Sequence, residues 1–189
     1  MKELGCTKIF ITVGYKSMML SFFLRKNPFV ETIKVKRKGN SFFLSNLISA
    51  GQKGKIVVIT SDNLISMDVK KFRNSYNEMQ HSFVVCIPGT MALEGDFLKI
   101  SNKQVIEICR GPTKATDYLL SGLQVINLDD LTLDLFDSTT DFHKVWDFLI
   151  KQRRLSHIYL ASVRWVAIDR PKDLFSLISS KYLESLDED

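Results

Sequence analysis

Lys55-Ile56-Val57-Val58-Ile59-Thr60, followed directly by Ser61-Asp62-Asn63, is the stretch that decides the fold of this chain. Its four consecutive β-branched apolar residues predict a strand that is buried on both faces, as in a parallel sheet. In open α/β sheets, ligands bind beyond the carboxyl ends of the strands. Asp62, at the exit of this strand, is therefore a candidate ligand-binding residue.

The segments on either side of this strand alternate between the two periodicities expected of strands and helices. Strands are predicted at 8–13, 32–36, 82–88, 123–126, 157–160 and 165–168, with a hairpin formed by 97–100 and 104–109 around Ser101-Asn102-Lys103. Helices are predicted at 17–24, 41–50, 68–76, 128–136, 142–152 and 172–183. This order predicts an α/β fold with a mainly parallel, mixed sheet covered by helices on both faces. No linker or repeat divides the sequence, so residues 1–189 are expected to form a single domain.

Composition excludes several classes of protein. No apolar run approaches the roughly 20 residues of a membrane span, and no signal peptide is expected from the first residues. The three cysteines lack metal-ligand spacing, which favours reduced, buried thiols and a cytoplasmic location. The net charge of +5 comes with no interleaved basic and aromatic residues, so nucleic acid is not an expected partner and a solvated basic face is the default.

A second acidic residue follows a predicted strand near the end of the chain, in Trp165-Val166-Ala167-Ile168-Asp169. Two carboxylates at strand ends, Asp62 and Asp169, would together suit one Mg²⁺ ion, which prefers oxygen ligands and shares them with substrate phosphates. The alternative is that each carboxylate caps a loop or helix. Asp169 would then cap the closing helix that begins after Arg170-Pro171.

Four segments, in order, resemble the sugar-1-phosphate nucleotidyltransferases over almost the whole chain. They resemble the family's G-x-x-x-I-x-x-x-V-G-Y-K, L-V-x-x-G-D-x-L-x-x-x-D-L, A-G-x-Y-V-F and W-x-D-I-D-T-P-E-D-L patterns. The corresponding residues are Lys2 to Lys16 (KELGCTKIFITVGYK), Val57 to Val69 (VVITSDNLISMDV), Leu120 to Leu131, and Trp165 to Leu174.

The resemblance implies a Rossmann-like nucleotidyltransferase fold and a reaction. A nucleoside monophosphate would pass from a nucleoside triphosphate to a sugar-1-phosphate or related phosphate monoester, with release of pyrophosphate. It implies Mg²⁺ as cofactor, bound by Asp62 and Asp169, and it leaves the catalytic residues unassigned. The substrate-binding residues that it implies are Lys16, Gly39, Asn40, Asn63, Lys114 and Gly122.

The chain also departs from the family pattern. The family's first strand and glycine-rich G-x-G-T-R-x-x-P loop would precede Met1, so the domain is expected to be incomplete at its N-terminus. Phe42-Phe43 stand in the region of the family's small-residue loop, Arg110-Gly111-Pro112 replaces E-K-P, and Ala167 replaces the first aspartate of the ending. Impaired transfer is therefore expected, and whether the chain is an enzyme stays open.

The alternative function is a non-catalytic, nucleotide- or sugar-phosphate-binding regulatory module of the same fold. The expected partners are a nucleoside triphosphate, a sugar phosphate and a partner chain that covers the missing strand.

Overall fold

The structure is a computed structural model that describes residues 6, 8–13, 17–34, 39–89, 95–111, 118–136, 141–160 and 164–179. It divides into two compact units. The first contains Met1–Lys55 and Asn127–Arg154, and the second contains Ile56–Ile126 and Leu155–Asp189. The single-domain organisation stays a prediction.

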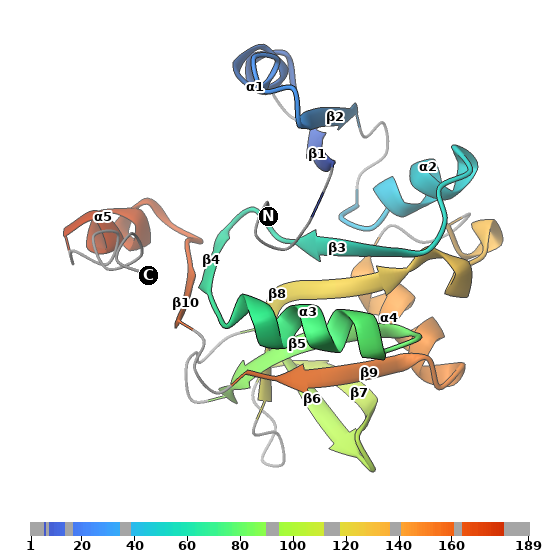
Figure 1. Ribbon diagram of the computed structural model, residues 1–189. Coiled ribbons are helices and arrows are strands. Elements are labelled where there is room, and N and C mark those ends of the chain that lie inside the picture. The colour runs from blue at the N-terminus through green and yellow to red at the C-terminus, as the bar shows by residue number, and fades with distance from the viewer. Residues whose placement is uncertain are drawn as a thin grey trace. The chain divides into compact units, whose positions relative to one another are not determined.

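A six-stranded sheet with the strand order β3-β8-β5-β9-β7-β6 forms the centre of the second unit (Figure 1). A further pairing between β6 and β8 partly closes this sheet. Its strands are β3 (Lys55–Ile59), β5 (Ser82–Pro88), β6 (Asp96–Ser101), β7 (Gln104–Arg110), β8 (Tyr118–Asn127) and β9 (Leu155–Tyr159).

The sheet is mixed, and the prediction of a mainly parallel sheet is wrong. β5 pairs with β9 in parallel, whereas the β5–β8, β6–β7, β6–β8 and β7–β9 pairs are antiparallel. The predicted hairpin is confirmed: Asn102 and Lys103 have φ values of 50° and 65°, as a two-residue type I′ turn requires. Tight turns of this kind join antiparallel strands, because a parallel crossover needs a much longer connection.

The core of this unit lies along β5, whose residues from Ser82 to Ile87 are all buried. Helix α3 (Val69–Glu78) contributes Phe72, which is 1% exposed and whose ring centroid lies 5.9 Å from that of Phe83. Asp68 caps this helix by accepting a 2.9 Å hydrogen bond from the Lys71 N–H. The helix therefore packs directly against the central strand.

A two-stranded ribbon is separate from the six-stranded sheet. Strand β4 (Asn63–Ser66), which the sequence did not predict, pairs antiparallel with β10 (Arg164–Ala167), and Asn63 lies opposite Ala167. Helix α5 (Pro171–Ser179) follows β10. At its start the Asp173 carboxylate accepts a 2.9 Å hydrogen bond from the Arg170 N–H.

The first unit contains a β-α-β element. Strands β1 (Ile9–Val13) and β2 (Val30–Lys34) are parallel, and helix α1 (Ser17–Leu24) connects them. Apolar side chains on α1 stay exposed, including Met18 at 84% and Phe22 at 62%. None of the helices in the described part of the chain is long and apolar enough to cross a membrane.

The rest of this unit is built around helix α4 (Phe142–Lys151), preceded by α2 (Phe43–Ser49) and two short 3-10 turns, η2 (Leu128–Asp130) and η3 (Leu133–Phe136). These turns replace the single helix predicted at 128–136. Helix α4 buries Phe142, Val145, Trp146 and Leu149 along one face, the spacing of an amphipathic helix. Asp130 is 4% exposed and accepts a 2.9 Å hydrogen bond from Arg154, which is 43% exposed.

Candidate functional site

The turn between β3 and β4 is held by the Asn63 side chain. The backbone N–H of Asn63 donates to the Thr60 carbonyl at 3.3 Å. Its side-chain Nδ2 donates to Asp62 Oδ1 at 3.0 Å and also contacts Thr60 Oγ1. Asn63 therefore orients the exposed carboxylate of Asp62, the residue that follows the predicted strand.

Gly122, on β8, lies directly against this turn. It accepts a 3.2 Å backbone hydrogen bond from the Thr60 N–H and has a φ of 79°, a region that favours glycine. A Cβ atom at this position would stand 2.5 Å from Asn63 Nδ2 and would also overlap Thr60 Oγ1. Glycine is thus required here both by the backbone conformation and by the close packing of the Asn63 side chain.

Asp169 is brought to the same turn by the β4–β10 ribbon. The Ile168 N–H donates a 2.8 Å hydrogen bond to the carbonyl of Asp62, so the residue next to Asp169 is bonded to Asp62 itself. Both aspartates are exposed. At the start of α5, the Asp173 carboxylate accepts a hydrogen bond from the Arg170 N–H. The two predicted metal ligands are therefore neighbours in the fold.

Trp165 fixes β10 to the six-stranded sheet. Its indole Nε1–H donates a 2.9 Å hydrogen bond to the carbonyl of Ser121, the residue before Gly122. The buried Ser121 hydroxyl donates in turn to the Val85 carbonyl at 2.9 Å. This chain of bonds runs from the ribbon through β8 to β5. The sequence placed Trp165 in the strand before Asp169 without giving it a role, and it gave no sign of the roles of Thr60 and Ser121, which depend on long-range pairing.

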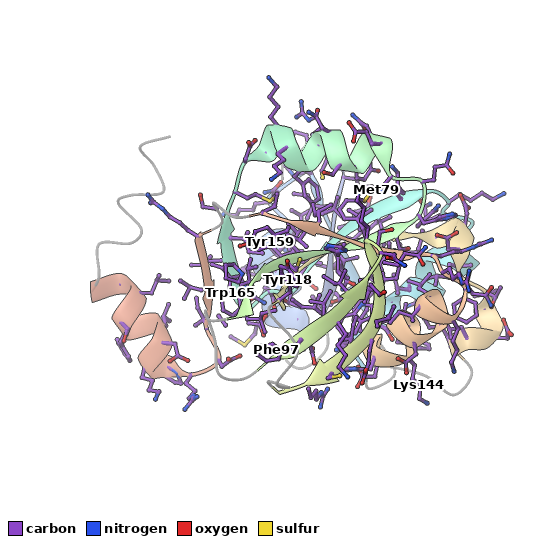
Figure 2. All side chains as sticks on the ribbon, turned by 90° about the horizontal axis from the view of Figure 1, so that it is seen from below. Met79, Phe97, Tyr118, Lys144, Tyr159 and Trp165 are labelled. Atoms are coloured by element: carbon purple, nitrogen blue, oxygen red, sulfur yellow. The ribbon has the colours of Figure 1, made fainter. Side chains whose placement is uncertain are left out.

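An aromatic cluster lies at the ends of β8 and β9. Figure 2 shows Tyr118 and Tyr159, whose ring centroids are 5.4 Å apart in an edge-on arrangement. The His157 ring lies 6.3 Å from that of Tyr118, and its Nδ1 is 3.1 Å from the Lys103 carbonyl. Burial lowers the pKa of His157, although the bond to the Lys103 carbonyl opposes this shift.

The donors at the turn fit a magnesium ion that is shared with a substrate. Mg²⁺ in proteins is often held by one or two carboxylates together with waters and substrate phosphates. Asp62 and Asp169 supply two exposed carboxylates on bonded segments, which is the donor set that such a site needs. No group of three or more His, Cys, Asp or Glu residues suited to a metal occurs among the described residues.

Four predicted substrate-binding residues remain: Lys16, Lys114, Gly39 and Asn40. Lys16 and Lys114 lie outside the described residues. Gly39, with φ 137°, and Asn40 belong to the first unit, where Asn40 Oδ1 accepts a 3.0 Å hydrogen bond from the Phe142 N–H. The Asn40 side chain thus holds the start of α4, and neither it nor Ser41 caps α2.

The Phe43 ring packs in the same place, with its centroid 6.1 Å from that of Phe142. The segment containing Gly39, Asn40 and Phe43 therefore supports α4 through a hydrogen bond and an aromatic contact.

This architecture is the nucleotidyltransferase fold, as comparison with solved structures shows. HddC from Yersinia pseudotuberculosis superposes with a TM-score of 0.73 at 18% identity, covering 95% of this chain and 80% of that chain. The same protein complexed with GMP-PN gives a TM-score of 0.74 at 18% identity, with the same coverage.

A protein from Bacillus anthracis, assigned as a glucose-1-phosphate thymidylyltransferase and crystallised with a sucrose, gives a TM-score of 0.78 at 16% identity. The match covers 100% of this chain and 80% of that chain. No family model matches the sequence, and no curated protein matches it.

Proposed function

We propose that this chain binds a nucleoside triphosphate, together with Mg²⁺ and a sugar phosphate, and that it transfers the nucleoside monophosphate slowly, with release of pyrophosphate. The observation that carries this proposal is the hydrogen bond between the Ile168 N–H and the Asp62 carbonyl, which makes the segments bearing Asp62 and Asp169 neighbours. The fold adds support, since a solved structure that shares it holds the nucleotide GMP-PN.

Each residue at the turn has a separate part in this proposal. Asp62 and Asp169 hold the metal, which neutralises charge on the phosphates when it is bound. Asn63 keeps the Asp62 carboxylate oriented through its 3.0 Å hydrogen bond. Gly122 leaves room for the Asn63 side chain, so the orientation of Asp62 depends on the absence of a Cβ at position 122.

Slow transfer is proposed because the chain lacks groups that the resemblance associates with rapid reaction. Ala167, opposite Asn63 in the ribbon, stands where the family has a further aspartate, and Arg110-Gly111 stand where it has Glu-Lys. Charged groups and hydrogen-bond donors fixed around the transition state often supply much of an enzyme's rate enhancement, and the loss of one donor costs about 10²–10³ in rate.

The free cysteines fit a cytoplasmic location, where these substrates occur.

A calorimetric titration with a nucleoside triphosphate, with and without Mg²⁺, tests the binding step. Asp62→Asn and Asp169→Asn should each abolish the part of the nucleotide affinity that depends on Mg²⁺. Asp134→Asn, an exposed carboxylate in the first unit, is the matched control and should bind like the wild type. Metal-dependent binding that survives both replacements would exclude the proposed site.

A pyrophosphate-release assay with a panel of triphosphates and sugar phosphates tests the transfer step. Release that depends on Asp62 supports the enzyme. Binding of nucleotide or sugar phosphate with no release of pyrophosphate would favour the second candidate, a non-catalytic regulatory module. The contacts of Phe43 and Asn40 with Phe142 favour that candidate. The resemblance assigns this segment to substrate binding, whereas here its side chains pack against and bond helix α4.

A further inference from the structure

Strand β8 has a bulge where it faces the central strand β5. The register between the two strands shifts there, so that Val85 alone lies opposite residues 121–123 of β8. The Ser121 side chain closes this bulge, since its hydroxyl donates to the Val85 carbonyl at 2.9 Å and accepts a 3.3 Å hydrogen bond from the Leu123 N–H. Bulges bend a strand and re-aim its side chains, and they are common beside functional sites. Two other segments bond to β8 at this bulge.

Adjacent carbonyl groups of the bulge hold these two segments. The Gly122 carbonyl accepts a 3.2 Å hydrogen bond from the Thr60 N–H, at the entrance to the turn that carries Asp62. The Ser121 carbonyl accepts a 2.9 Å hydrogen bond from the Trp165 indole Nε1–H, on the strand that leads to the second predicted metal ligand. The two segments that bear the aspartates are therefore fixed to neighbouring residues of a single strand.

The β4–β10 ribbon meets the bulge with one of its faces. Trp165 lies opposite Ile65, and Ala167 lies opposite Asn63. Cross-strand partners and residues two positions apart share a face, so the indole and the Asn63 side chain lie on the same side of the ribbon. Both reach β8 there, because the Asn63 amide packs against Gly122 while the indole makes its hydrogen bond. The ribbon is thus held to the bulge at two points.

A cation that two carboxylates share requires both of them at the right separation. Ligating groups need to be held within about 0.5 Å of their productive positions, and the residues behind them supply that precision. We propose that Trp165 is a positioning residue for the metal site: its indole N–H fixes where β10 lies on β8 and thereby sets the separation of the Asp62 and Asp169 carboxylates. This role rests on the proposed function, in which the two aspartates hold Mg²⁺.

Removal of the indole N–H tests this role through the affinity for a metal ion. Mn²⁺ is the probe, because it suits the same oxygen ligands as Mg²⁺ and is detected by electron paramagnetic resonance. Trp165→Phe should weaken Mn²⁺ binding by about 3- to 10-fold, the factor that one neutral hydrogen bond contributes. Trp146→Phe, in helix α4 of the first unit, is the matched control and should bind Mn²⁺ like the wild type.

A pair of tryptophan analogues covers the case in which Trp165→Phe disturbs the packing of the ribbon. Benzothienylalanine at position 165 keeps the size of the ring but carries sulfur in place of the N–H, so it should weaken Mn²⁺ binding as Trp165→Phe does. Azatryptophan at the same position keeps the N–H and should retain the wild-type affinity. Equal affinities with the two analogues would overturn the role of the indole N–H.

Asp169→Asn separates positioning from a general loss of structure. If Trp165 acts by placing the Asp169 carboxylate, Trp165→Phe should change the Mn²⁺ affinity by less than about 2-fold once that carboxylate is gone. Equal weakening with and without the carboxylate would contradict the proposal, because Trp165 would then act on the fold as a whole and not on Asp169.

Asp62→Asn distinguishes a failure of this role from a failure of the proposed function. Wild-type Mn²⁺ binding that Asp62→Asn leaves intact would remove the proposed metal site, and the role of Trp165 with it. Binding that requires Asp62 but does not respond to loss of the Trp165 N–H would leave the site in place and exclude Trp165 alone.

Discussion

Replacing Gly122 with alanine should destabilise the protein through the turn that carries Asp62. The residue has a φ of 79°, where a side chain costs about 1–2 kcal/mol. The new Cβ would also stand 2.5 Å from Asn63 Nδ2 and overlap Thr60 Oγ1, and overpacking of this kind costs about 1–3 kcal/mol. The two contributions together predict a loss of about 2–5 kcal/mol in the free energy of unfolding.

Gly111 offers a matched control in the same unit. Its φ is 80°, and an added Cβ would meet no atom within 4 Å. Gly111→Ala should therefore lower the free energy of unfolding only by the cost of a side chain at positive φ, about 1–2 kcal/mol. The difference between the two variants measures the overlap with the Asn63 and Thr60 side chains.

Urea denaturation of both variants, followed by circular dichroism, gives the two free energies. A third variant, Gly122→Ala with Asn63→Ala, removes one of the overlapping side chains and should cost less than the sum of the single changes. Equal losses for Gly122→Ala and Gly111→Ala would refute the reasoning, because they would mean that Asn63 does not pack on Gly122. An additive double variant would refute it independently.

Three other residues give predictions of different kinds. Burial raises the pKa of the Cys86 thiol to about 12, so iodoacetamide at pH 8 should modify Cys86 only on unfolding; labelling as fast as in denaturant would contradict this. Because burial lowers the pKa of His157 from its ordinary value near 6.5, the unfolded chain binds the proton first, so stability should fall as pH drops below about 6.5. His157→Gln should flatten that decline, and an unchanged pH profile of urea midpoints would exclude the histidine as its cause. Arg154→Met removes the Arg154 cation from the buried Asp130 carboxylate and should lower the free energy of unfolding by about 1–2 kcal/mol, after allowance for the exposure of Arg154. A change below about 0.5 kcal/mol in urea denaturation would show that the pair is screened.

Local signals predicted much of the fold. The run of β-branched residues predicted β3, and the helical periodicity of the sequence predicted α3 and α4. The direction of the strands was not available from such signals. A central strand such as β5 is buried on both faces in either kind of sheet, so its apolar run does not distinguish parallel from antiparallel pairing. Strand β4 was missed because only four residues separate the Asp62 turn from the approach to α3.

For the candidate site, too, local sequence signals predicted some residues, whereas contacts between distant segments could not be predicted. Asp62 and Asp169 were predicted from their positions after strands, and the structure makes their segments neighbours. The resemblance implied that Asn40 binds substrate, and the structure adds a hydrogen bond to its side chain from the Phe142 N–H, 102 residues along the chain. The hydrogen bond from the Trp165 indole to the Ser121 carbonyl could not be predicted either, because contacts between residues 44 positions apart depend on tertiary register and leave no local pattern.

The β4–β10 ribbon bears on how tightly the site can bind a ligand. A two-stranded ribbon is marginally stable alone, and segments of this kind open locally without unfolding the rest of a protein. If the ribbon opened in this way, Asp62 would separate from Asp169 while the six-stranded sheet stayed intact. The measured affinity would then be the intrinsic affinity multiplied by the fraction of molecules in which the ribbon is paired. A bound ligand that bridges the two carboxylates would hold the ribbon paired and so slow amide hydrogen exchange along β10. Exchange at β10 would then measure how much of the site is occupied.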